Sequence, residues 1–474
     1  MTVLAAARVA TLVGAFDRSP AYLGLAEALR MLIAEGRVPV GARLPSERDL
    51  TTALGVSRTT VTRAYAVLRE ERYLDSQLGS GSVTRLPVSR LGRTDHLLIP
   101  RGSDEDSIDL TIATPAAPPG TAAAYERAVS QLPAYLSGTG YYPTGLPALR
   151  EALAARYAVR GLATDPSQIV IVAGALAGVA VAAQALIGPG DRVLVETPTY
   201  PNPITTLRAR HARLLTTAVD PEHGWDVEHL GRLATQAKAA YLIPDFHNPT
   251  GALMSSATRI EVAAALGDTV PIVDESMVDL ALDDDPMPEP FAVHSRDAIT
   301  VGSSSKAFWG GLRIGWMRVP TSRVAAVTAA RMSLDLSSPP VEQLVLLEML
   351  ADEATIREHH RSTLLASRAA LLTAIAGRLP SWEVAPGGGG LALWCRLPEP
   401  LSSTLSVTAE RQGVYLAAGP SFAPEGGLEH RVRIPYTQRP DVLIEAVRRI
   451  ALAWDEAIAE DRRTTRTGRI PVVA

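Results

Sequence analysis

The sequence predicts an α/β protein in two parts, a small helical module at the N-terminus and a larger body built on a mainly parallel sheet. Beyond residue 107, helical patterns alternate with short apolar runs, which is typical of such sheets. The length of 474 residues is too great for one domain. Residues 1–86 carry 11 arginines and 8 acidic residues, whereas the remainder carries 35 basic and 42 acidic residues. We therefore predict a module over residues 1–86, a linker over 87–107 and a body over 108–474.

The composition is that of an ordinary water-soluble protein, with 47% hydrophobic and 20% charged residues. No run of 18 apolar residues occurs, and Arg8, Asp17 and Arg18 interrupt the stretch where a signal peptide would lie. We therefore expect a cytoplasmic protein. The single cysteine, Cys395, excludes an internal disulfide and a cysteine-based zinc site, and we expect no metal site. Cys395 ends the apolar run Leu391–Cys395, so we expect it in the core rather than as a nucleophile.

Two helices are predicted at the start of the module. Apolar residues recur at helical spacing from Tyr22 to Glu35, and Gly36 ends this helix. A second helix starts after Ser46, because a serine followed by Asp49 three positions later resembles a capping box. The basic balance of the module suggests a polyanionic partner for this end of the chain alone.

A third helix follows the turn Gly55–Val56, with Ser57 as its N-cap. It should bury one apolar face and leave the polar and basic residues of its first turns exposed. A short helix, a glycine turn and a helix of this kind are typical of DNA recognition in the major groove. The linker that follows the module is either a plain tether or, through its arginines, an additional contact with DNA. The residues expected to be buried are Val61, Ala64, Tyr65 and Leu68.

Two short strands, Tyr73–Leu74 and Ser82–Val83, flank a tip at Gly79–Gly81 and would form a wing. The stretch from Leu44 to Val83 resembles the winged helix-turn-helix of the GntR regulators. This resemblance implies binding to double-stranded DNA, at an operator with paired half-sites. The alternative is a protein-binding module whose arginines are merely solvated. The residues expected to contact DNA are Arg43, Arg48, Ser57, Arg58, Thr59, Thr60, Arg63 and Gly81.

The functional prediction for the body depends on the stretch Gly302–Gly315. The chain has 46 basic residues but only two lysines, Lys238 and Lys306. A lysine in a chain that otherwise uses arginine suits a task that a guanidinium cannot perform. One such task is to lose a proton and form a Schiff base with an aldehyde cofactor. We therefore predict that Lys306 is the reactive residue.

The neighbours of Lys306 suit a phosphorylated aldehyde. Ser303 and Ser305 offer hydroxyl donors and Arg313 a bidentate guanidinium, so the three could converge on a phosphate. The surrounding apolar residues should keep the amine partly dry and lower its pKa toward neutrality. The stretch resembles the cofactor-lysine loop of fold-type I pyridoxal-phosphate enzymes, the aspartate aminotransferase family. This resemblance implies pyridoxal 5′-phosphate as the cofactor, attached to Lys306.

Two further segments resemble phosphate contacts of the same family. Either Tyr141 or Tyr142 is expected to reach the cofactor phosphate of the partner subunit, unless the segment is simply a packed turn. Small residues follow the buried strand Ile169–Val172, so the backbone N–H groups of Ala175 and Leu176 can approach a phosphate at a helix N-terminus. The family often has a glutamine near this turn, which this chain lacks.

The resemblance also implies the contacts of the cofactor ring. Tyr200 should stack on the ring or else pack in the core, and Asn248 should donate to the phenolic oxygen unless it only forms an Asn-Pro turn. Asp274 should pair with the pyridine nitrogen and keep it protonated, so that the ring can act as an electron sink; Glu275 is the competing assignment. Regulators of this type commonly carry a tyrosine where this chain has Ser276, so we expect amino acids to turn over poorly.

Arg433, in the predicted strand His430–Tyr436, resembles the arginine that binds the α-carboxylate of an amino acid; a surface arginine is the alternative. The whole chain from Tyr22 to about Trp454 resembles the MocR subfamily of GntR regulators. This implies a homodimeric regulator whose fold-type I body includes a smaller C-terminal α+β subdomain. The effector would be the cofactor itself or a small amine or amino acid. The alternatives are an active aminotransferase with a DNA-binding domain, and a structural DNA-binding protein with an inactive body.

Overall fold

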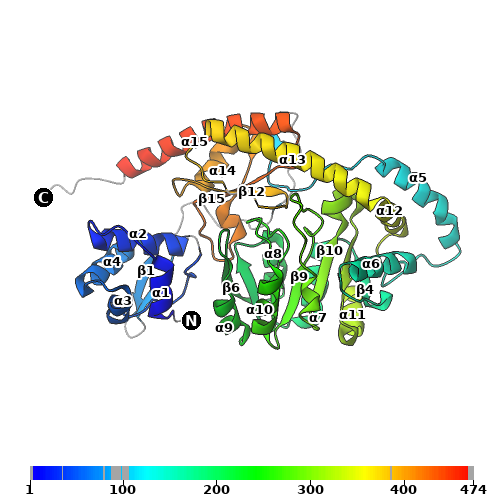
Figure 1. Ribbon diagram of the computed structural model, residues 1–474, viewed down its shortest axis with the longest axis horizontal. Coiled ribbons are helices and arrows are strands. Elements are labelled where there is room, and N and C mark those ends of the chain that lie inside the picture. Colours follow the sequence, from blue (N-terminus) through cyan, green and yellow to red (C-terminus); the bar gives the residue numbers. More distant parts are fainter. Residues whose placement is uncertain are drawn as a thin grey trace.

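The computed structural model describes residues 4–34, 36–77, 81–86, 98, 106–384 and 387–467. Most of the predicted linker lies outside these residues, as do Gly79 and Ser80 of the predicted wing tip. Figure 1 shows a small N-terminal module, coloured blue, beside a much larger body. The α/β fold class is therefore confirmed.

The module consists of helices followed by a two-stranded wing. The side chain of Ser46 accepts a hydrogen bond from the Asp49 N–H, and that of Ser57 accepts one from the Thr60 N–H, so both predicted N-caps are confirmed. A further helix, α1, was not predicted, and no side-chain hydrogen bond caps its start. The elements are α1 (Ala6–Val13), α2 (Ala21–Ala34), α3 (Glu47–Leu54), α4 (Arg58–Glu70), β1 (Leu74–Gln77) and β2 (Gly81–Thr84).

The core of the module lies between α2 and α4. All four residues of α4 that were expected to be buried are inside, where they pack with Leu25 and Leu29. The Tyr65 hydroxyl donates to the Pro45 carbonyl oxygen at 2.9 Å, which satisfies its one buried polar group. The wing strands pair antiparallel, with Leu74 opposite Thr84, as the sequence predicted.

The body is built on an eight-stranded sheet in the order β4-β11-β10-β9-β8-β5-β6-β7. Strands β6, β5, β8, β9 and β10 are parallel, whereas β11 and β7 run antiparallel to their neighbours. The strands are β4 (Ile169–Val172), β5 (Arg192–Thr197), β6 (Arg213–Asp220), β7 (Gly224–Trp225), β8 (Ala239–Leu242), β9 (Val270–Asp274), β10 (Ile299–Ser303) and β11 (Gly315–Arg318).

Helices cover both faces of this sheet, which explains why its central strands are apolar throughout instead of alternating. One face packs on α7 (Ala175–Leu186), α8 (Pro201–Ala209) and α11 (Val324–Leu334). The other packs on α6 (Pro147–Val159), α9 (Val227–Ala234), α10 (Ser256–Leu266) and α12 (Pro340–Ala351), and α5 (Thr121–Gln131) lies against α12.

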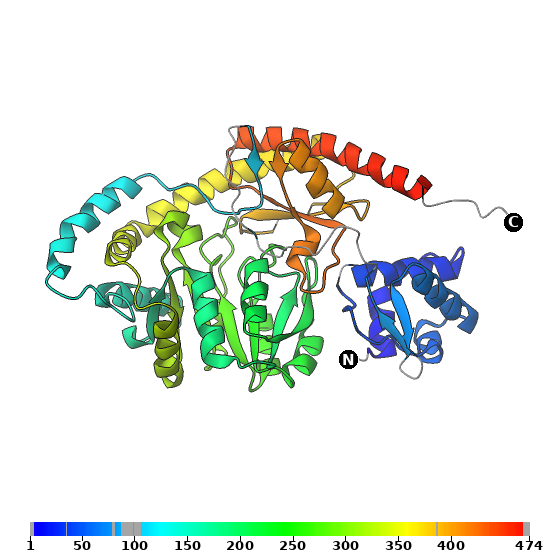
Figure 2. The same ribbon diagram turned by 180° about the vertical axis from the view of Figure 1, so that it is seen from behind.

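A smaller α+β subdomain lies above the sheet, as predicted, and Figure 2 shows its two long helices running side by side. Its antiparallel sheet has the order β12-β15-β14, and Cys395 of β12 is fully buried, as expected of a core residue. The segment after the linker joins this subdomain, because β3 (Ile108–Asp109) pairs with β13 (Val414–Tyr415). The remaining elements are α13 (Glu353–Arg378), β12 (Ala392–Arg396), α14 (Ser402–Arg411), β14 (Ala417–Ala418), β15 (Arg431–Pro435) and α15 (Pro440–Thr467).

The module contacts the body near the β6–β7 edge of the large sheet. Arg8 forms an ion pair with Asp226, and Arg37 lies 3.2 Å from a carboxylate oxygen of Asp220. The Leu428 N–H also donates to the carbonyl oxygen of Ala34, at 2.5 Å. Within the described part of the chain, none of the helices combines the length and the apolar character needed to span a bilayer.

The packing of the module predicts a contrast between two leucines of α2. Leu29 is fully buried, whereas Leu23 on the same helix is 45% exposed. Leu29→Ala should therefore lower the opening free energy of the module by about 2–5 kcal/mol, and Leu23→Ala should change it by less than about 1 kcal/mol. Hydrogen exchange of the α4 amides in the full-length protein measures this difference. Equal effects of the two substitutions would contradict the packing described above.

Candidate functional site

The candidate site lies beyond the carboxyl ends of the parallel strands, where ligands bind in open α/β sheets. Asp274 is the last residue of β9 and Ser303 the last of β10, and Lys306 follows three residues later. Tyr200 caps the start of α8 just beyond β5. Three parallel strands of the sheet, β5, β9 and β10, thus deliver predicted site residues to one edge.

Lys306 lies on a single π-helical turn, Ser305–Trp309. Its Nζ donates to the carbonyl oxygen of Ala113 and to Oγ1 of Thr114, both at 2.7 Å. The pKa of Lys306 is lowered to about 8, first by burial and then by the charge of Arg433, while Asp274 opposes the shift. The predicted lowering is therefore confirmed, and at neutral pH a useful fraction of the amine is unprotonated.

Arg313 and the start of α7 lie together at the place where the sequence predicted a phosphate cradle, and phosphate binding there stays a prediction. Arg313 adopts a left-handed conformation with φ of 51°, and its Nη2 donates to the carbonyl oxygen of Ala173 at 3.1 Å. A Cβ on Gly174, whose φ is 99°, would lie 3.0 Å from that guanidinium. The next two residues, Ala175 and Leu176, begin α7, where backbone N–H groups have no partner within the helix. The cradle therefore combines a guanidinium with a helix N-terminus.

Ser303 and Ser305 lie beside this cradle and are both buried. Oγ of Ser303 accepts a hydrogen bond from the Ser305 N–H at 3.1 Å, which fixes the turn that leads from β10 to Lys306. Ser303 pairs with Gly315 of β11, and a Cβ on Gly315 would lie 2.6 Å from the backbone of Gly174. The serines and the start of α7 are therefore held together by close backbone packing.

The structure separates the two carboxylates that the sequence left as alternatives. Asp274 accepts from the Tyr241 hydroxyl at 2.7 Å and from the Ser276 N–H at 2.9 Å. Burial raises its pKa, while the hydrogen bonds from Ser276 and Tyr241 and the charge of Lys306 oppose that rise. Glu275 instead forms an ion pair with Arg160 at 2.8 Å. Asp274 is therefore the carboxylate that belongs to the site.

Arg433 closes the site from the smaller subdomain. It is 2% exposed, so the surface alternative is wrong. Its guanidinium donates to Oδ1 of Asn248 at 3.2 Å and to the carbonyl oxygen of Thr111, and its Cζ atom lies 5.0 Å from the ring centroid of Phe422. Burial lowers the pKa of Arg433 to about 10. The site thus combines residues from both parts of the body.

The two tyrosine predictions differ in what surrounds each ring. Burial raises the pKa of Tyr200, and the charges of Arg433, Asp274 and Arg313 also act on it, so Tyr200 lies near these residues. It also packs against the apolar core of the sheet, and its stacking on the cofactor ring stays a prediction. Tyr142 instead packs edge-on against Tyr135, with ring centroids 6.1 Å apart. The structure groups Tyr142 with that ring and not with Lys306, and its role in a partner subunit stays a prediction.

Sequence reasoning missed Tyr241 and the segment Thr111–Thr114. Tyr241 precedes Asn248 by seven residues in the chain, and strand periodicity alone did not indicate that its hydroxyl reaches Asp274. Thr114 lies 192 residues from Lys306, so no local pattern could have paired them.

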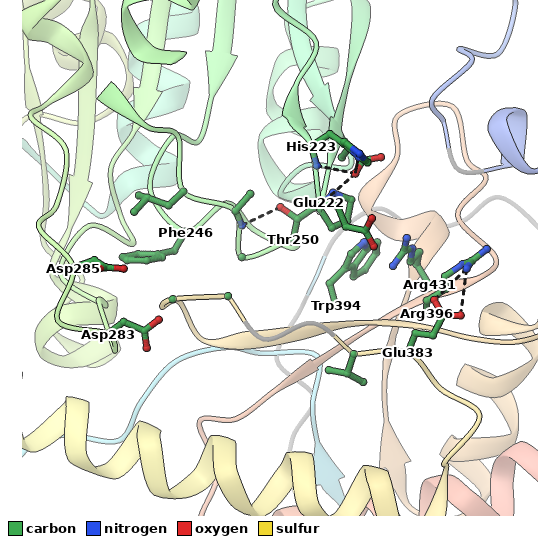
Figure 3. A pocket seen from close by; sticks show the side chains of 18 of the residues that line it. Glu222, His223, Phe246, Thr250, Asp283, Asp285, Glu383, Trp394, Arg396 and Arg431 are labelled. Atoms are coloured by element: carbon green, nitrogen blue, oxygen red, sulfur yellow. Dashed lines mark hydrogen bonds and ion pairs between the residues drawn. The ribbon is translucent and has the colours of Figure 1, made fainter. Parts of the chain in front are cut away.

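A separate cavity of about 640 Å³ opens on the other side of the loop that carries Asn248. Figure 3 shows Asp283 and Asp285 near Phe246 on one side, and Arg396 and Arg431 on the other. The residues that line it include none of those grouped around Lys306. This cavity is therefore distinct from the group of residues around Lys306.

The predicted DNA-contacting residues fall into two groups. Arg48, Ser57, Arg58 and Thr59 are exposed on α3 and at the start of α4. Thr60, Arg63, Arg43 and Gly81 are described by their contacts within the module, and for all eight residues a role in DNA binding stays a prediction. The Arg63 guanidinium lies 4.7 Å from the ring centroid of Tyr22, Thr60 bonds to Ser57, and Arg43 packs so closely on Gly81 that a Cβ there would lie 2.7 Å from its Nε.

Comparisons with known proteins match both parts of the chain. Residues 125–450 match the model of aminotransferase class I and II, and residues 21–83 match that of bacterial regulatory proteins of the gntR family. The chain is 28% identical over 432 residues to the HTH-type transcriptional regulator YdcR of Escherichia coli, covering 85% of this chain and 92% of that protein.

Two further comparisons extend this result. The HTH-type pyridoxine biosynthesis transcriptional regulator PdxR of Corynebacterium glutamicum is 28% identical, covering 81% of this chain and 87% of that protein. The body also resembles the solved structure of LysN, an α-aminoadipate aminotransferase of Thermus thermophilus complexed with N-(5′-phosphopyridoxyl)-L-leucine. That match has a TM-score of 0.66 at 24% identity, and it covers 75% of this chain and 94% of that one.

The environment of Lys306 predicts its reactivity toward an amine-selective reagent. Because burial lowers its pKa to about 8, labelling of Lys306 should rise with pH and reach half its maximum near pH 8. Mass spectrometry can follow this labelling, with Lys238, the other lysine in the chain, as an internal reference. A midpoint near pH 10, typical of a solvated lysine, would contradict the environment described here.

Proposed function

Because this chain belongs to the class I and II aminotransferase family and joins it to a gntR-family domain, the fusion that characterises the MocR subfamily, we propose that it is a transcription regulator that senses pyridoxal 5′-phosphate. The module binds DNA, and Lys306 binds the cofactor. The observation that carries this proposal is the grouping of Lys306, Asp274 and Arg313 in one site of a chain that also has a winged helix-turn-helix. We further propose that it acts as a cytoplasmic homodimer.

The residues of the site fit the polar parts of this cofactor. The N-terminus of α7 and Arg313 suit the phosphate, and buried Asp274 suits the ring nitrogen. Lys306, with its lowered pKa, suits the aldehyde. When bound, the cofactor supplies an electrophilic carbon and an electron-withdrawing ring. The protein supplies orientation, a buried negative charge and an amine that loses its proton near neutral pH.

An amino compound is a suitable effector at the same site. Arg433 donates to two neutral oxygen acceptors, those of Asn248 and Thr111. A carboxylate would form charge-assisted hydrogen bonds, which are roughly twice as strong as neutral ones. An amino acid could therefore compete for this guanidinium while its amine lies near Lys306. The cofactor alone is the other effector, and the relation to PdxR supports it.

Regulation is favoured over efficient catalysis. The backbone N–H of Ser276 donates to Asp274, and Ser276 stands at the sequence position where regulators of this type commonly carry a tyrosine. At that position this chain has no tyrosine hydroxyl to contact the phenolic oxygen of the cofactor. This difference supports a slow turnover of amino acids. The relation to YdcR over 85% of this chain also supports a regulator.

A homodimer would explain the exposed apolar residues around α5. Val129 is 53% exposed, Leu136 68% and Tyr141 62%. Figure 2 shows α5, in cyan, at the end of the body farthest from the module. A second copy of the chain could cover these side chains and receive Tyr141 or Tyr142 in its own cofactor site.

DNA binding predicts a specific loss at the start of α4. Arg58→Ala should weaken operator binding by about 1–3 kcal/mol if the guanidinium reads a base, which is roughly five- to 150-fold. Arg18→Ala removes the same charge from the segment between α1 and α2 and serves as the control. Gel-shift titrations at fixed salt compare the two. Unchanged binding by the Arg58 variant would reject its role in recognition.

Cofactor attachment predicts a contrast between the two lysines. Lys306→Arg should abolish the visible absorbance of covalently bound pyridoxal 5′-phosphate, because a guanidinium keeps its proton and does not condense with an aldehyde. Lys238→Arg should leave that absorbance intact. Borohydride reduction followed by peptide mapping identifies the attachment site, and modification of Lys238 instead would overturn the assignment.

Turnover distinguishes the regulator from the aminotransferase alternative. With cofactor bound, mixtures of amino acids and a keto acid should turn over more slowly than about 1 s⁻¹, the low end of ordinary enzymatic rates. Steady-state assays of product formation measure this rate, with the Lys306→Arg variant as the blank. Sustained turnover above that rate would favour the enzyme.

A further inference from the structure

A segment that directly follows the linker crosses the candidate site. We call residues 109–114 the strap. At its start, the Leu110 N–H donates to the Tyr415 carbonyl oxygen at 2.9 Å, which ties the strap to the smaller subdomain. Both the N–H and the hydroxyl of Thr111 donate to Oδ1 of Asp109, at 2.7 and 2.6 Å, and shape the turn that follows. The strap therefore has a defined path before it reaches Lys306.

The strap supplies hydrogen-bond acceptors to the two central cations of the site. Its Thr111 carbonyl oxygen accepts from Arg433. The Ala113 carbonyl oxygen and Oγ1 of Thr114 each accept from Lys306 Nζ at 2.7 Å. These are the two cations to which the proposed function assigns the cofactor and the effector carboxylate. The strap and the proposed ligands therefore compete for the same donors.

The orientation of Thr114 is fixed by packing. A Cβ on Gly310 would lie 2.9 Å from Cγ2 of Thr114, so the threonine methyl lies against the bare backbone of the lysine turn. With its methyl placed there, the hydroxyl faces Lys306. Ala113 is 7% exposed, so its carbonyl oxygen is held in a similarly enclosed position.

We propose that the strap is a ligand-responsive element of the site and that Thr114 is the positioning residue that holds the amine of Lys306. This inference rests on the proposed function for its ligands. Two close acceptors stabilise the protonated amine, because hydrogen bonds from an ammonium are charge-assisted. Condensation requires the neutral amine, which adds to the aldehyde carbon; a C=N bond forms and the aldehyde oxygen leaves as water. After condensation the nitrogen of Lys306 carries at most one proton, so it can no longer donate to both the Ala113 carbonyl oxygen and Oγ1 of Thr114.

The consequence is that cofactor attachment loosens one end of the strap and an effector carboxylate on Arg433 loosens the other. Only Ile108 separates the strap from the end of the linker that leads to the DNA-binding module. Occupancy of the site would therefore change how firmly that linker is anchored. The effect of the ligand can thus reach the module along the chain itself, from the strap through the linker, without movement of the large sheet.

The test uses Thr114→Val, which keeps the shape of the side chain and removes its acceptor, and Thr114→Ser, which keeps the acceptor. The charged groups that act on Lys306, namely Arg433, Asp274 and Arg313, stay unchanged in both variants. Thr363→Val, on the exposed part of α13, is the matched control. In the absence of cofactor, amine-selective labelling of Lys306 at pH 7 should be about three- to tenfold faster in the valine variant than in the serine variant, the wild type or the control.

The same proteins are then mixed with pyridoxal 5′-phosphate, and the attachment rate is followed by absorbance across the pH range. The valine variant should react about three- to tenfold faster at pH 7, with its midpoint at lower pH. Unchanged labelling of Lys306 in the valine variant would overturn the role of Thr114, even if the cofactor attaches normally. If Lys306 is labelled faster in the valine variant but the cofactor attaches to none of the proteins, the role of Thr114 is upheld and the proposed function is rejected.

Hydrogen exchange in the wild type tests release of the strap. Addition of pyridoxal 5′-phosphate, and then of an amino acid, should speed exchange of the Leu110 and Thr111 amides by about fivefold or more. The amides of α13 provide the reference within the same protein. Unchanged or slower exchange in the strap after the cofactor has visibly attached would overturn the ligand-responsive role.

Discussion

The site depends on a half-buried amine held between opposing charges. Lys306 is partly removed from water, and this burial together with Arg433 and Arg313 disfavours its proton, while Asp274 favours it. The balance places the pKa near 8, so the amine is neither permanently charged nor permanently neutral. A guanidinium could not be brought into this range by the same surroundings. The chemistry therefore depends on where the fold places one lysine.

The parallel sheet creates that placement. Parallel strands end at the same edge, so residues that follow β5, β9 and β10 meet there although they are far apart in sequence. Consecutive side chains at the end of β9 also point in different directions. For this reason Asp274 reaches the site, while Glu275 pairs with Arg160 on another side. The smaller subdomain then completes the site with Arg433, which no strand of the large sheet could supply.

The DNA-binding module is connected to the body in two different ways. Arg8 and Arg37 contact carboxylates near the β6–β7 edge, a surface arrangement that salt can weaken. The chain itself provides the other connection, because the linker leads directly to β3 and the strap. The first connection sets where the module rests, and the second links it to the groups around Lys306. In a regulator, the DNA-binding module needs a defined position in the free protein and a connection through which ligand binding at the site can change that position.

The sequence by itself determined the local features of this protein. Ser46 and Ser57 cap their helices because a hydroxyl and a nearby N–H are enough, and apolar spacing alone placed Val61 and Leu68 in the module core. The rarity of lysine, with Ser303, Ser305 and Arg313 close by in the chain, identified Lys306. The resemblance to a known family supplied Asn248, Asp274 and Arg433, which no local pattern joins.

The tertiary structure alone decided the contacts between distant segments. It chose Asp274 over Glu275, buried Arg433, and brought Tyr241, Ala113 and Thr114 to the site. It also grouped Tyr142 with Tyr135. The physical reason is range: capping and periodicity act within a few residues, whereas burial and ion pairing depend on which elements the folded chain brings together.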